Sequence, residues 1–372
     1  MSTLLNLEGP INAELLDGKS RITSLPVLVI MPHNRCNCRC MMCDIWKIKQ
    51  VRELTSEDLK PHLSAVRELG IQWVVLSGGE PLLHSHLSDL SSLFRNEGIR
   101  ITLLTAGLLL ERCSEAIAQN FDDVIASLDG PMDIHDRIRG VPGAFQKLTR
   151  GIVALRTRRP GIPVHARCTI QKENFSHLRD TVRAARLMAL NSISFLAADL
   201  SSAAFNHTES WPEERRSRVA LNPHEVEHLV DEVEALIYEN QRDIEEGFIV
   251  ESPSKLWKIV RHFRAQIGQC SPLSPSCNAP WVSAVIDAEG NLLPCFFHQP
   301  LGNIRNGSLK DILNSERSIN FRRHLDISAN PICQRCVCPL YLGSSRVGIE
   351  TPRAPRYEGG TNSSVTRTAS GR

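Results

Sequence analysis

The feature that most constrains the fold of this chain is a series of six short apolar segments between residues 26 and 200, separated by amphipathic ones. Short continuous runs rich in Val, Ile and Leu are typical of strands that are buried in a parallel sheet. Six such units are too few to close an eight-stranded barrel, so we expect an α/β fold with an open, partial (β/α)6 barrel. The predicted strands are Val27–Met31, Trp73–Leu76, Arg100–Thr105, Val124–Leu128, Pro163–Ile170 and Ser192–Ala197.

The segments between these strands have the spacing of helices. Thr55 and Asp58 have the spacing of a capping box, which marks the start of a helix. We predict helices over Thr55–Leu69, His86–Asn96, Glu111–Gln119, Ala144–Arg156 and Asn174–Ala189.

Polar residues gather directly after the predicted strands. In a parallel α/β barrel the carboxyl ends of the strands form one rim, and the chemistry is carried there. The sequence therefore predicts a single site on this rim. Its segments are Cys36–Cys43, Ser77–Pro81, Thr105–Gly107, Ser127–Pro131 and Asp199.

Twelve cysteines stand out in an otherwise ordinary composition of 372 residues, and ten of them fall into two groups. The formal net charge is only +2, which gives no reason to expect a nucleic-acid or membrane partner. The first 25 residues include Glu8, Glu14 and Asp17, so they do not have the pattern of a secretory signal. We expect a cytoplasmic protein in which clustered thiols bind metal rather than form disulfides.

The first cysteine group has the spacing Cys36-x3-Cys40-x2-Cys43 in the loop after the first predicted strand. Three thiolates this close together can hold one face of an iron–sulfur cubane and leave the fourth iron open. A structural zinc site, with Cys38 or His33 as fourth ligand, is the alternative that spacing alone leaves open.

The second group is divided between a predicted β-hairpin and a short knuckle. Cys277 and Cys295 flank the hairpin, and Cys333 and Cys336 follow about forty residues later. Four thiols can close around one cluster, and structural zinc is again the alternative. The hairpin strands are predicted at Trp281–Ile286 and Asn291–Phe297, and helices follow at Leu309–Asn314 and Phe321–Leu325.

The first group and its surroundings resemble the radical S-adenosylmethionine (radical SAM) superfamily, which has CxxxCxxC after the first strand of a partial (β/α)6 barrel. The resemblance implies that Cys36, Cys40 and Cys43 hold a [4Fe-4S] cluster whose open iron binds SAM. Cys38 would then be a bystander. Met42 stands where the superfamily usually has an aromatic residue near the adenine, and it fills that space with a thioether.

Two further motifs resemble SAM-binding motifs of the same superfamily. Gly78-Gly79-Glu80-Pro81 is similar to its GGEP motif, which implies contacts from Gly78, Gly79 and Glu80 to the SAM ammonium. The stretch that begins at Ser127 resembles its strand-4 signature, which implies that Ser127 and Arg139 contact the SAM carboxylate. Thr105-Ala106-Gly107 departs from the usual Thr-Asn-Gly and is assigned no role.

The second group resembles a SPASM domain and its shortened relative, the twitch domain. The resemblance implies a small Cys-rich domain, a β-hairpin plus helix, with one auxiliary [4Fe-4S] cluster on Cys277, Cys295, Cys333 and Cys336. Cys338 could replace Cys336 as a ligand. Cys270 is a structural thiol or a donor of a hydrogen atom to a substrate radical.

The reaction implied by this resemblance is reductive cleavage of SAM to a 5′-deoxyadenosyl radical, which takes hydrogen from a substrate carbon. With an auxiliary cluster as electron acceptor, we expect oxidation (dehydrogenation) of a small molecule such as a sugar or aminocyclitol. The alternatives are a peptide- or protein-modifying maturase, an epimerase that uses a cysteine hydrogen donor and, more remotely, a non-catalytic zinc-binding protein. Asp199 and Asp129 are candidate bases, and the electron donor would be a flavodoxin or ferredoxin.

These patterns divide the chain into five predicted parts. The first strand begins near residue 26, which leaves no room before it for a peptide-recognition domain and makes a small-molecule substrate comparably attractive. The parts are an N-terminal extension (1–25), the barrel (26–200), a bridging helical segment with a helix near His224–Tyr238 (201–268), the SPASM/twitch-like domain (269–345) and a disordered tail (346–372).

Overall fold

The computed structural model describes residues 20–200, 204 and 211–343. The predicted tail and most of the predicted N-terminal extension lie outside these residues.

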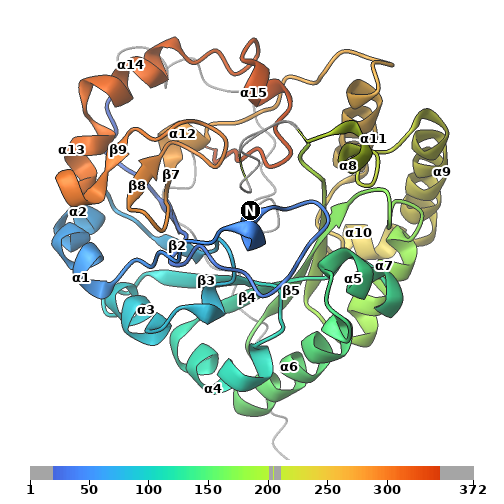
Figure 1. The fold of residues 1–372 in the computed structure, drawn as a ribbon, viewed down its shortest axis with the longest axis horizontal. Coiled ribbons are helices and arrows are strands. Elements are labelled where there is room, and N and C mark those ends of the chain that lie inside the picture. Colours follow the sequence, from blue (N-terminus) through green and yellow to red (C-terminus); the bar gives the residue numbers. More distant parts are fainter. Residues whose placement is uncertain (1–19, 201–203, 205–210, 344–372) are drawn as a thin grey trace, which may run out of the picture.

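Six parallel strands pair in chain order and form the curved sheet that the sequence predicts (Figure 1). Each observed strand agrees with its predicted range to within one residue at either end. Helices line the outer side of the sheet and bury its apolar outward-facing side chains, while the inner face of β5 carries His165, Arg167 and Thr169. The strands are β1 (Val27–Ile30), β2 (Trp73–Leu76), β3 (Arg100–Thr105), β4 (Asp123–Ser127), β5 (Val164–Ile170) and β6 (Ser192–Ala197).

The predicted helices are present, with two corrections. The helix expected over Thr55–Leu69 is divided into α1 (Ser56–Leu59), η4 (Lys60–His62) and α2 (Leu63–Glu68), with Pro61 in the first turn of η4. The Thr55–Asp58 capping box is confirmed. The other helices at these positions are α3 (Leu87–Arg95), α4 (Leu110–Asn120), α6 (Ala144–Arg158) and α7 (Leu178–Leu187).

The start of α7 at Leu178 shows that the prediction of a helix from Asn174 was wrong. The Asn174 side chain instead holds the loop after β5. Its Oδ1 accepts from Gln171 N at 2.8 Å, and its Nδ2 donates to Asp129 O at 2.9 Å. A fully buried asparagine that bonds two loops in this way keeps the chain out of a helix.

One helix on the barrel rim was not predicted. α5 (Met132–Arg139) follows β4 and ends at Gly140, whose φ of 62° is the left-handed conformation common after a helix. Gly140 also lies against the loop after β1, where a Cβ would meet Arg39 O at 2.7 Å. The end of α5 is therefore fixed against the loop that carries the first cysteines.

The strands of the predicted SPASM-like region continue the sheet of the barrel. β7 (Ser283–Ile286) pairs in parallel with β1, and β8 (Asn291–Leu293) and β9 (Gly302–Asn303) follow it in antiparallel pairing. Among the described residues the result is one nine-stranded sheet, in the order β6-β5-β4-β3-β2-β1-β7-β8-β9. The predicted hairpin is confirmed, but both strands are shorter than predicted. The first begins at Ser283 because residues 279–282 form α12 (Ala279–Val282), and the second ends at Leu293 instead of Phe297.

The remaining helices cover the two ends of the sheet. α13 (Leu309–Leu313) and α14 (Glu316–His324) lie on the β9 side, and α8 (Glu213–Arg216), α9 (Pro223–Glu239), α10 (Gln241–Glu245) and α11 (Pro253–Gln266) lie on the β6 side (Figure 1). α15 (Pro331–Gln334) lies between these two groups of helices. Residues 248–250 add a short parallel bridge to β6, in which Ile193 N donates to Phe248 O at 2.7 Å. None of the described helices has the length and apolar character needed to cross a bilayer.

Candidate active site

The loop that carries the first cysteines, residues 33–44 (the cysteine loop), is held from two sides. From the β2 side, Glu80 N donates to Arg35 O at 2.7 Å. From the end of α5, Met41 N donates to Ile138 O at 3.1 Å and Arg39 N to Arg139 O at 2.9 Å. Backbone hydrogen bonds on two sides therefore hold this loop in place without a ligand.

Gly78 and Gly79 provide the close approach between the β2 loop and the cysteine loop. A Cβ on Gly79 would lie 2.0 Å from Arg35 O, and Gly78 has a φ of 113°. Both positions therefore require glycine for packing within the protein itself. Their predicted contacts with SAM stay predictions.

We expect Gly79→Ala to lower the free energy of unfolding by about 1–3 kcal/mol, because an added methyl in a packed site forces the backbone to shift. The measurement is chemical unfolding of the iron-loaded protein. Gly161→Ala is the matched control, since a Cβ there would meet nothing within 4 Å. Equal losses in the two variants would contradict this account of the loop.

Four thiols, Cys36, Cys38, Cys40 and Cys43 (the first thiol group), lie close together in the cysteine loop. The Cys38 thiol is 1% exposed and bonds with the thiols of Cys36 and Cys40. Its hydrogen bond to Cys40, together with the nearby Arg139, lowers the pKa of Cys40 to about 7. Burial raises the pKa of Cys43 to about 12.

The donor chemistry of this group fits a [4Fe-4S] cluster. All the donors are sulfur, and the Arg139 Nη1 lies 3.6 Å from Cys40 Sγ, where a cation stabilises thiolate charge. The buried Arg139 Nε has no partner among the described residues. No three His, Cys, Asp or Glu side chains in residues 20–200, 204 and 211–343 are arranged to hold a single metal ion, so the fit rests on donor type and position.

Glu80 connects the ends of β2 and β3. Its fully buried carboxylate accepts from Thr105 Oγ1 at 2.8 Å, from Ala106 N at 2.8 Å and from Leu82 N at 3.1 Å. Burial nevertheless raises the pKa of Glu80. Its predicted contact with the SAM ammonium stays a prediction, since three protein donors already engage the carboxylate.

Thr105 is a site residue that the sequence analysis assigned no role. Its hydroxyl donates to Glu80, and it also accepts from Gly107 N at 3.0 Å. One signal for this residue was available in the sequence. Thr105 places a hydroxyl at the carboxyl end of β3, the strand that follows the one before Gly78-Gly79-Glu80-Pro81.

Asp129 and Arg139 form a buried ion pair on the rim. Asp129 Oδ1 also accepts from Thr169 N at 2.9 Å. Burial raises the pKa of Asp129, and the Arg139 guanidinium opposes that shift. The structure thus places Asp129 in a structural bond network, and the predicted roles of Asp129 as base and of Arg139 as a SAM contact stay predictions.

Ser127 lies at the end of β4 and is half-buried. Its partner in the β4–β5 register is Arg167, so the predicted SAM-carboxylate residue adjoins a cation on the next strand.

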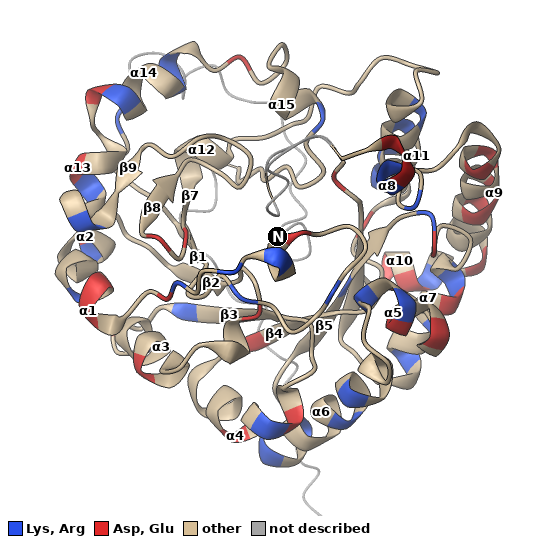
Figure 2. Ribbon diagram, viewed as in Figure 1, with Lys and Arg blue, Asp and Glu red and all other residues tan. Residues whose placement is uncertain are grey.

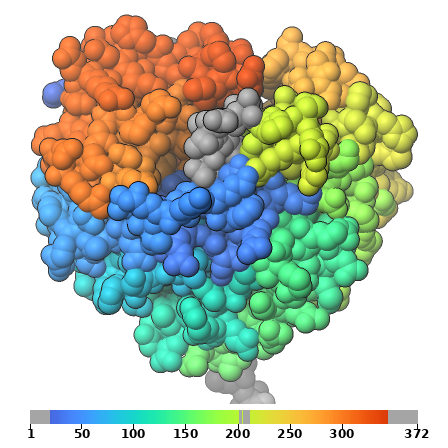
Figure 3. All heavy atoms as spheres, viewed as in Figure 1, coloured from blue at the N-terminus to red at the C-terminus, as the bar shows by residue number. Residues whose placement is uncertain are grey.

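The bridging segment packs directly on the cysteine loop. Trp211 Nε1 donates to Asp44 Oδ2 at 2.9 Å, and Arg215 forms an ion pair with the same carboxylate. Met42 packs in a small apolar group with Trp211, and its sulfur lies 3.4 Å from Gln171 Nε2. In Figure 3 the yellow-green atoms after residue 210 adjoin the blue atoms of the N-terminal part. Met42 therefore has a defined packing role beside its predicted place near adenine.

The five thiols of Cys277, Cys295, Cys333, Cys336 and Cys338 (the second thiol group) are also brought together. Burial raises the pKa of Cys295 to about 12 and of Cys333 to about 11, and neighbouring thiols of the group contribute to both shifts. Cys338 influences both Cys277 and Cys336, so it lies among the predicted ligands. The choice between Cys336 and Cys338 as ligand stays open.

His298 and Cys270 have different surroundings in the structure. His298, which has the pattern of an ordinary histidine, lies with Nε2 3.4 Å from Cys333 Sγ. Cys270 instead lies with its sulfur 3.6 Å from Arg261 O, on α11. The structure therefore places His298 at the second thiol group and Cys270 beside α11.

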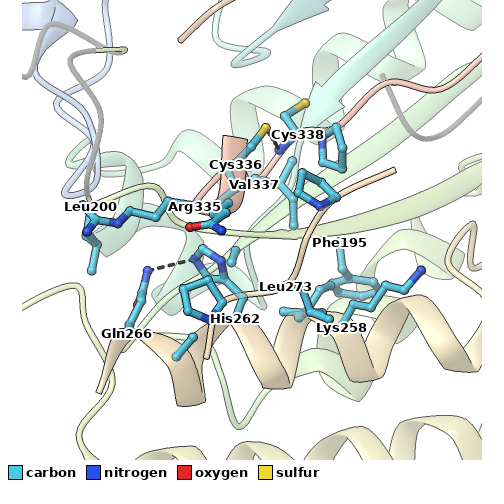
Figure 4. Close-up of a pocket in the computed structure, with 18 of the residues that line it drawn as sticks. Phe195, Leu200, Lys258, His262, Gln266, Leu273, Arg335, Cys336, Val337 and Cys338 are labelled. Carbon is cyan, nitrogen blue, oxygen red and sulfur yellow. Dashed lines mark hydrogen bonds between the residues drawn. The ribbon is translucent and has the colours of Figure 1, made fainter. Parts of the chain in front are cut away.

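A cavity of about 990 Å³ lies between the barrel rim and the second thiol group (Figure 4). Residues of β5, β6 and α11 form one side, and Cys336 and Cys338 lie on the other. The predicted SAM contacts do not line it, but Arg167, the register partner of Ser127, does. The cavity thus lies beside the predicted SAM site and opens on the second thiol group.

Glu251 is a buried acid on this cavity that the sequence analysis missed. It is 3% exposed, and its Oε2 accepts from Phe195 N at 2.9 Å, where the bridge to β6 ends. Its Oε1 has no partner among the described residues. Burial raises the pKa of Glu251 to about 7, and Arg167 and Lys255 oppose the shift.

Asp199, the other predicted base, is buried just after β6. It lies near His262, a cavity-lining residue on α11 whose pKa burial lowers to about 4. His262 Nε2 lies 2.9 Å from Gln266 Nε2, as Figure 4 shows. Asp199 therefore adjoins the cavity, and its role as a base stays a prediction.

Two models of known protein families match this chain. The family model of the radical SAM superfamily matches residues 30–185, and that of the iron-sulfur cluster-binding domain SPASM matches residues 277–337. The chain is a radical SAM protein with a C-terminal SPASM domain. A radical SAM domain implies a [4Fe-4S] cluster and SAM as cofactors, and a SPASM domain implies auxiliary iron–sulfur binding.

Curated relatives of this radical SAM protein include enzymes of two kinds. The chain is 31% identical over 156 residues to an AdoMet-dependent heme synthase of Methanosarcina barkeri. The matched region is 41% of this chain and 44% of the relative. The chain is also 30% identical over 164 residues to a PqqA peptide cyclase of Bradyrhizobium diazoefficiens. That matched region is 43% of this chain and 42% of the relative. The matches thus span less than half the length of these relatives.

A solved structure supports the fold. SuiB of Streptococcus suis bound to S-adenosylmethionine superposes with a TM-score of 0.63 and 15% identity, covering 88% of this chain and 76% of that one. The same protein is also known bound to its precursor peptide SuiA. At this identity the likeness shows the fold alone.

Proposed function

We propose that this radical SAM protein is an oxidoreductase that removes hydrogen from a carbon of an organic substrate held in the cavity beside the second thiol group. The supporting observation is that Cys336 and Cys338 line the same cavity as Arg167 of β5 and residues 194–197 of β6. With cluster and SAM bound, the first site would supply reductive SAM cleavage and hydrogen-atom abstraction. The second thiol group would hold the auxiliary [4Fe-4S] cluster that supports oxidation.

The chain's own residues would position these groups and handle the proton. Cys36, Cys40 and Cys43 would hold the first cluster, with Arg139 beside Cys40. Because Glu251 Oε1 is buried without a partner on the cavity, it would accept a proton that the substrate loses on oxidation. A pKa near 7 suits a base that works at neutral pH.

The substrate class has two candidates. Peptides are suggested by the relative named PqqA peptide cyclase. A porphyrin is suggested by relatives named heme synthase and Fe-coproporphyrin III synthase, and the cavity favours it through its volume and cationic lining. An aminocyclitol, which carries ammonium groups, is disfavoured by the same lining. An epimerase that uses Cys270 is disfavoured because that thiol bonds Arg261 O.

The test is 5′-deoxyadenosine formation by anaerobically reconstituted protein given SAM and dithionite. We expect the product from protein that holds about eight irons per chain, as two [4Fe-4S] clusters require. Fully loaded protein that makes no 5′-deoxyadenosine would overturn the proposal. In Cys333→Ala we expect about four irons per chain. An unchanged iron content would contradict the part of the proposal that places an auxiliary cluster on the second thiol group.

Glu251 gives a prediction of pH dependence. Burial raises its pKa to about 7 in the folded protein, and a free glutamate titrates near 4.3. Between these values the folded protein holds a proton that the unfolded chain has released, so this residue's contribution to stability falls as the pH rises. From about pH 4 to pH 8 we expect the free energy of unfolding of Glu251→Gln to rise relative to wild type by on the order of 3 kcal/mol.

The measurement is urea unfolding of both proteins across that range. Glu234→Gln, on the exposed side of α9, is the control, because no described residue bonds that carboxylate. Parallel stability curves for wild type and Glu251→Gln would contradict the buried, protonated state of this acid.

A further inference from the structure

The cavity beside the second thiol group is lined by far more cations than anions. Its charged residues are Arg167, Lys172, Arg216, Lys255, Lys258, Arg335, Glu213 and Glu251. This excess is local, since the whole chain carries a formal net charge of only +2. Figure 2 shows Lys and Arg on α11, both signs of charge on α8, and acidic residues along α9. A cavity lined mainly by one sign of charge concentrates ligands of the opposite sign.

Part of this charge is already neutralised within the protein. Lys172 Nζ lies 3.1 Å from Glu225, and Arg216 Nη1 lies 4.0 Å from Glu213. Lys258 and Arg335 differ, because no described acidic group lies within ion-pair distance of either. These two cations therefore have charge available for a ligand.

The positions of Lys258 and Arg335 suit a ligand that spans the cavity. Lys258 lies one helical turn before His262, on the face of α11 that lines the cavity. Arg335 lies between Cys333 and Cys336 in the second thiol group, across the cavity from α11 (Figure 4). A ligand with anionic groups at separate points would contact both and would lie beside the thiols.

We propose that this cavity binds an organic polyanion, a molecule with at least two carboxylate or phosphate groups, between Lys258 of α11 and Arg335 of the second thiol group. The inference rests on the proposed function only in identifying this ligand with the substrate. Guanidinium and ammonium groups form charge-assisted hydrogen bonds with both kinds of anion. The unpartnered Glu251 Oε1 adds a site for one neutral donor group of the same ligand.

The experiment measures binding of pyranine, a flat aromatic trisulfonate, by fluorescence anisotropy, with pyrenebutanol as the neutral probe. The reconstituted full chain is compared with Lys258→Gln, Arg335→Gln and the double variant. Both side chains are exposed, so the substitutions leave the core intact. We expect each single variant to bind pyranine about tenfold more weakly, which is the usual value of a hydrogen bond to a charged group.

Arg112→Gln is the matched control, because Arg112 is an exposed cation on α4 that does not line the cavity. We expect it to bind pyranine as wild type does. Unchanged binding in the Lys258 and Arg335 variants, or equal binding of the neutral probe, would overturn the proposal. A loss of affinity for pyranine in Arg112→Gln as large as in the cavity variants would overturn the proposal as well.

Competition distinguishes the two kinds of anion. Displacement of pyranine by mellitate, a benzene hexacarboxylate, would indicate a polycarboxylate ligand, and displacement by pyrophosphate would indicate a phosphorylated one. Either result supports the polyanion site, and displacement by neither would overturn it. Because binding is measured without turnover, a failure of 5′-deoxyadenosine formation would affect the proposed function and leave this result standing.

Discussion

Replacing Cys36, Cys40 and Cys43 together by alanine is expected to abolish 5′-deoxyadenosine formation and to lower the iron content from about eight to about four atoms per chain. The reason is that these thiols are the predicted ligands of the cluster that binds SAM, while the second thiol group lies elsewhere on the sheet. The measurement is iron and acid-labile sulfide on anaerobically reconstituted protein, with 5′-deoxyadenosine assayed after dithionite and SAM.

Cys38→Ala is the control within the same loop. Its thiol bonds those of Cys36 and Cys40, but the motif assigns it no iron, so we expect this variant to keep about eight irons. Loss of iron in Cys38→Ala would make it a ligand and contradict the assigned set. Zinc in place of iron at both thiol groups would refute the assignment of clusters altogether.

Replacing Arg139 by methionine is expected to lower the free energy of unfolding by about 3–5 kcal/mol, because it leaves the charge of Asp129 buried without its partner. Asp129 has no exposed surface, so water cannot replace the guanidinium. The measurement is urea unfolding of the iron-loaded protein. The loss should shrink at acidic pH, where Asp129 takes up a proton and no longer carries charge.

Two further variants separate this effect from a general loss of packing. Asp129→Leu combined with Arg139→Met removes both charges, and we expect it to recover much of the stability. Arg137 lies on the same helix as Arg139 and forms an exposed ion pair with Glu173. We expect Arg137→Met, which breaks that pair, to lower the free energy of unfolding by at most about 1 kcal/mol. If Arg137→Met were as damaging as Arg139→Met, burial of the ion pair would not be the cause.

The strands of the barrel could be predicted because each is a short apolar run bounded by polar residues. Local pattern says little, however, about which distant strands pair. The parallel pairing of β7 with β1 joins residues about 256 positions apart, such as Val27 and Ser283. This pairing depends on the tertiary fold, so the sequence predicts the hairpin but not its place beside β1. α5 was missed because its segment is polar and overlaps a motif interpreted only for its ligand contacts.

The site shows the same division. The cysteine positions were readable because three thiols at fixed spacing restrict the chemistry strongly. The surroundings of each motif were not readable, because Glu80 meets Thr105 only when β2 and β3 lie side by side. Glu251 follows two helices and reaches the cavity only through a two-bond bridge to β6, and no local pattern predicts that bridge.

The parallel ladder between β1 and β7 has a consequence for electron movement. The cysteine loop leaves the carboxyl end of β1, and Cys277 and Cys295 flank the strands that begin with β7. The pairing of Val27–Ile30 with Ser283–Ile286 therefore ties the strand that precedes the cysteine loop to the hairpin that Cys277 and Cys295 flank. Because tunnelling rates fall steeply with distance, the register of this ladder would help to set the rate of any electron exchange between the two sites.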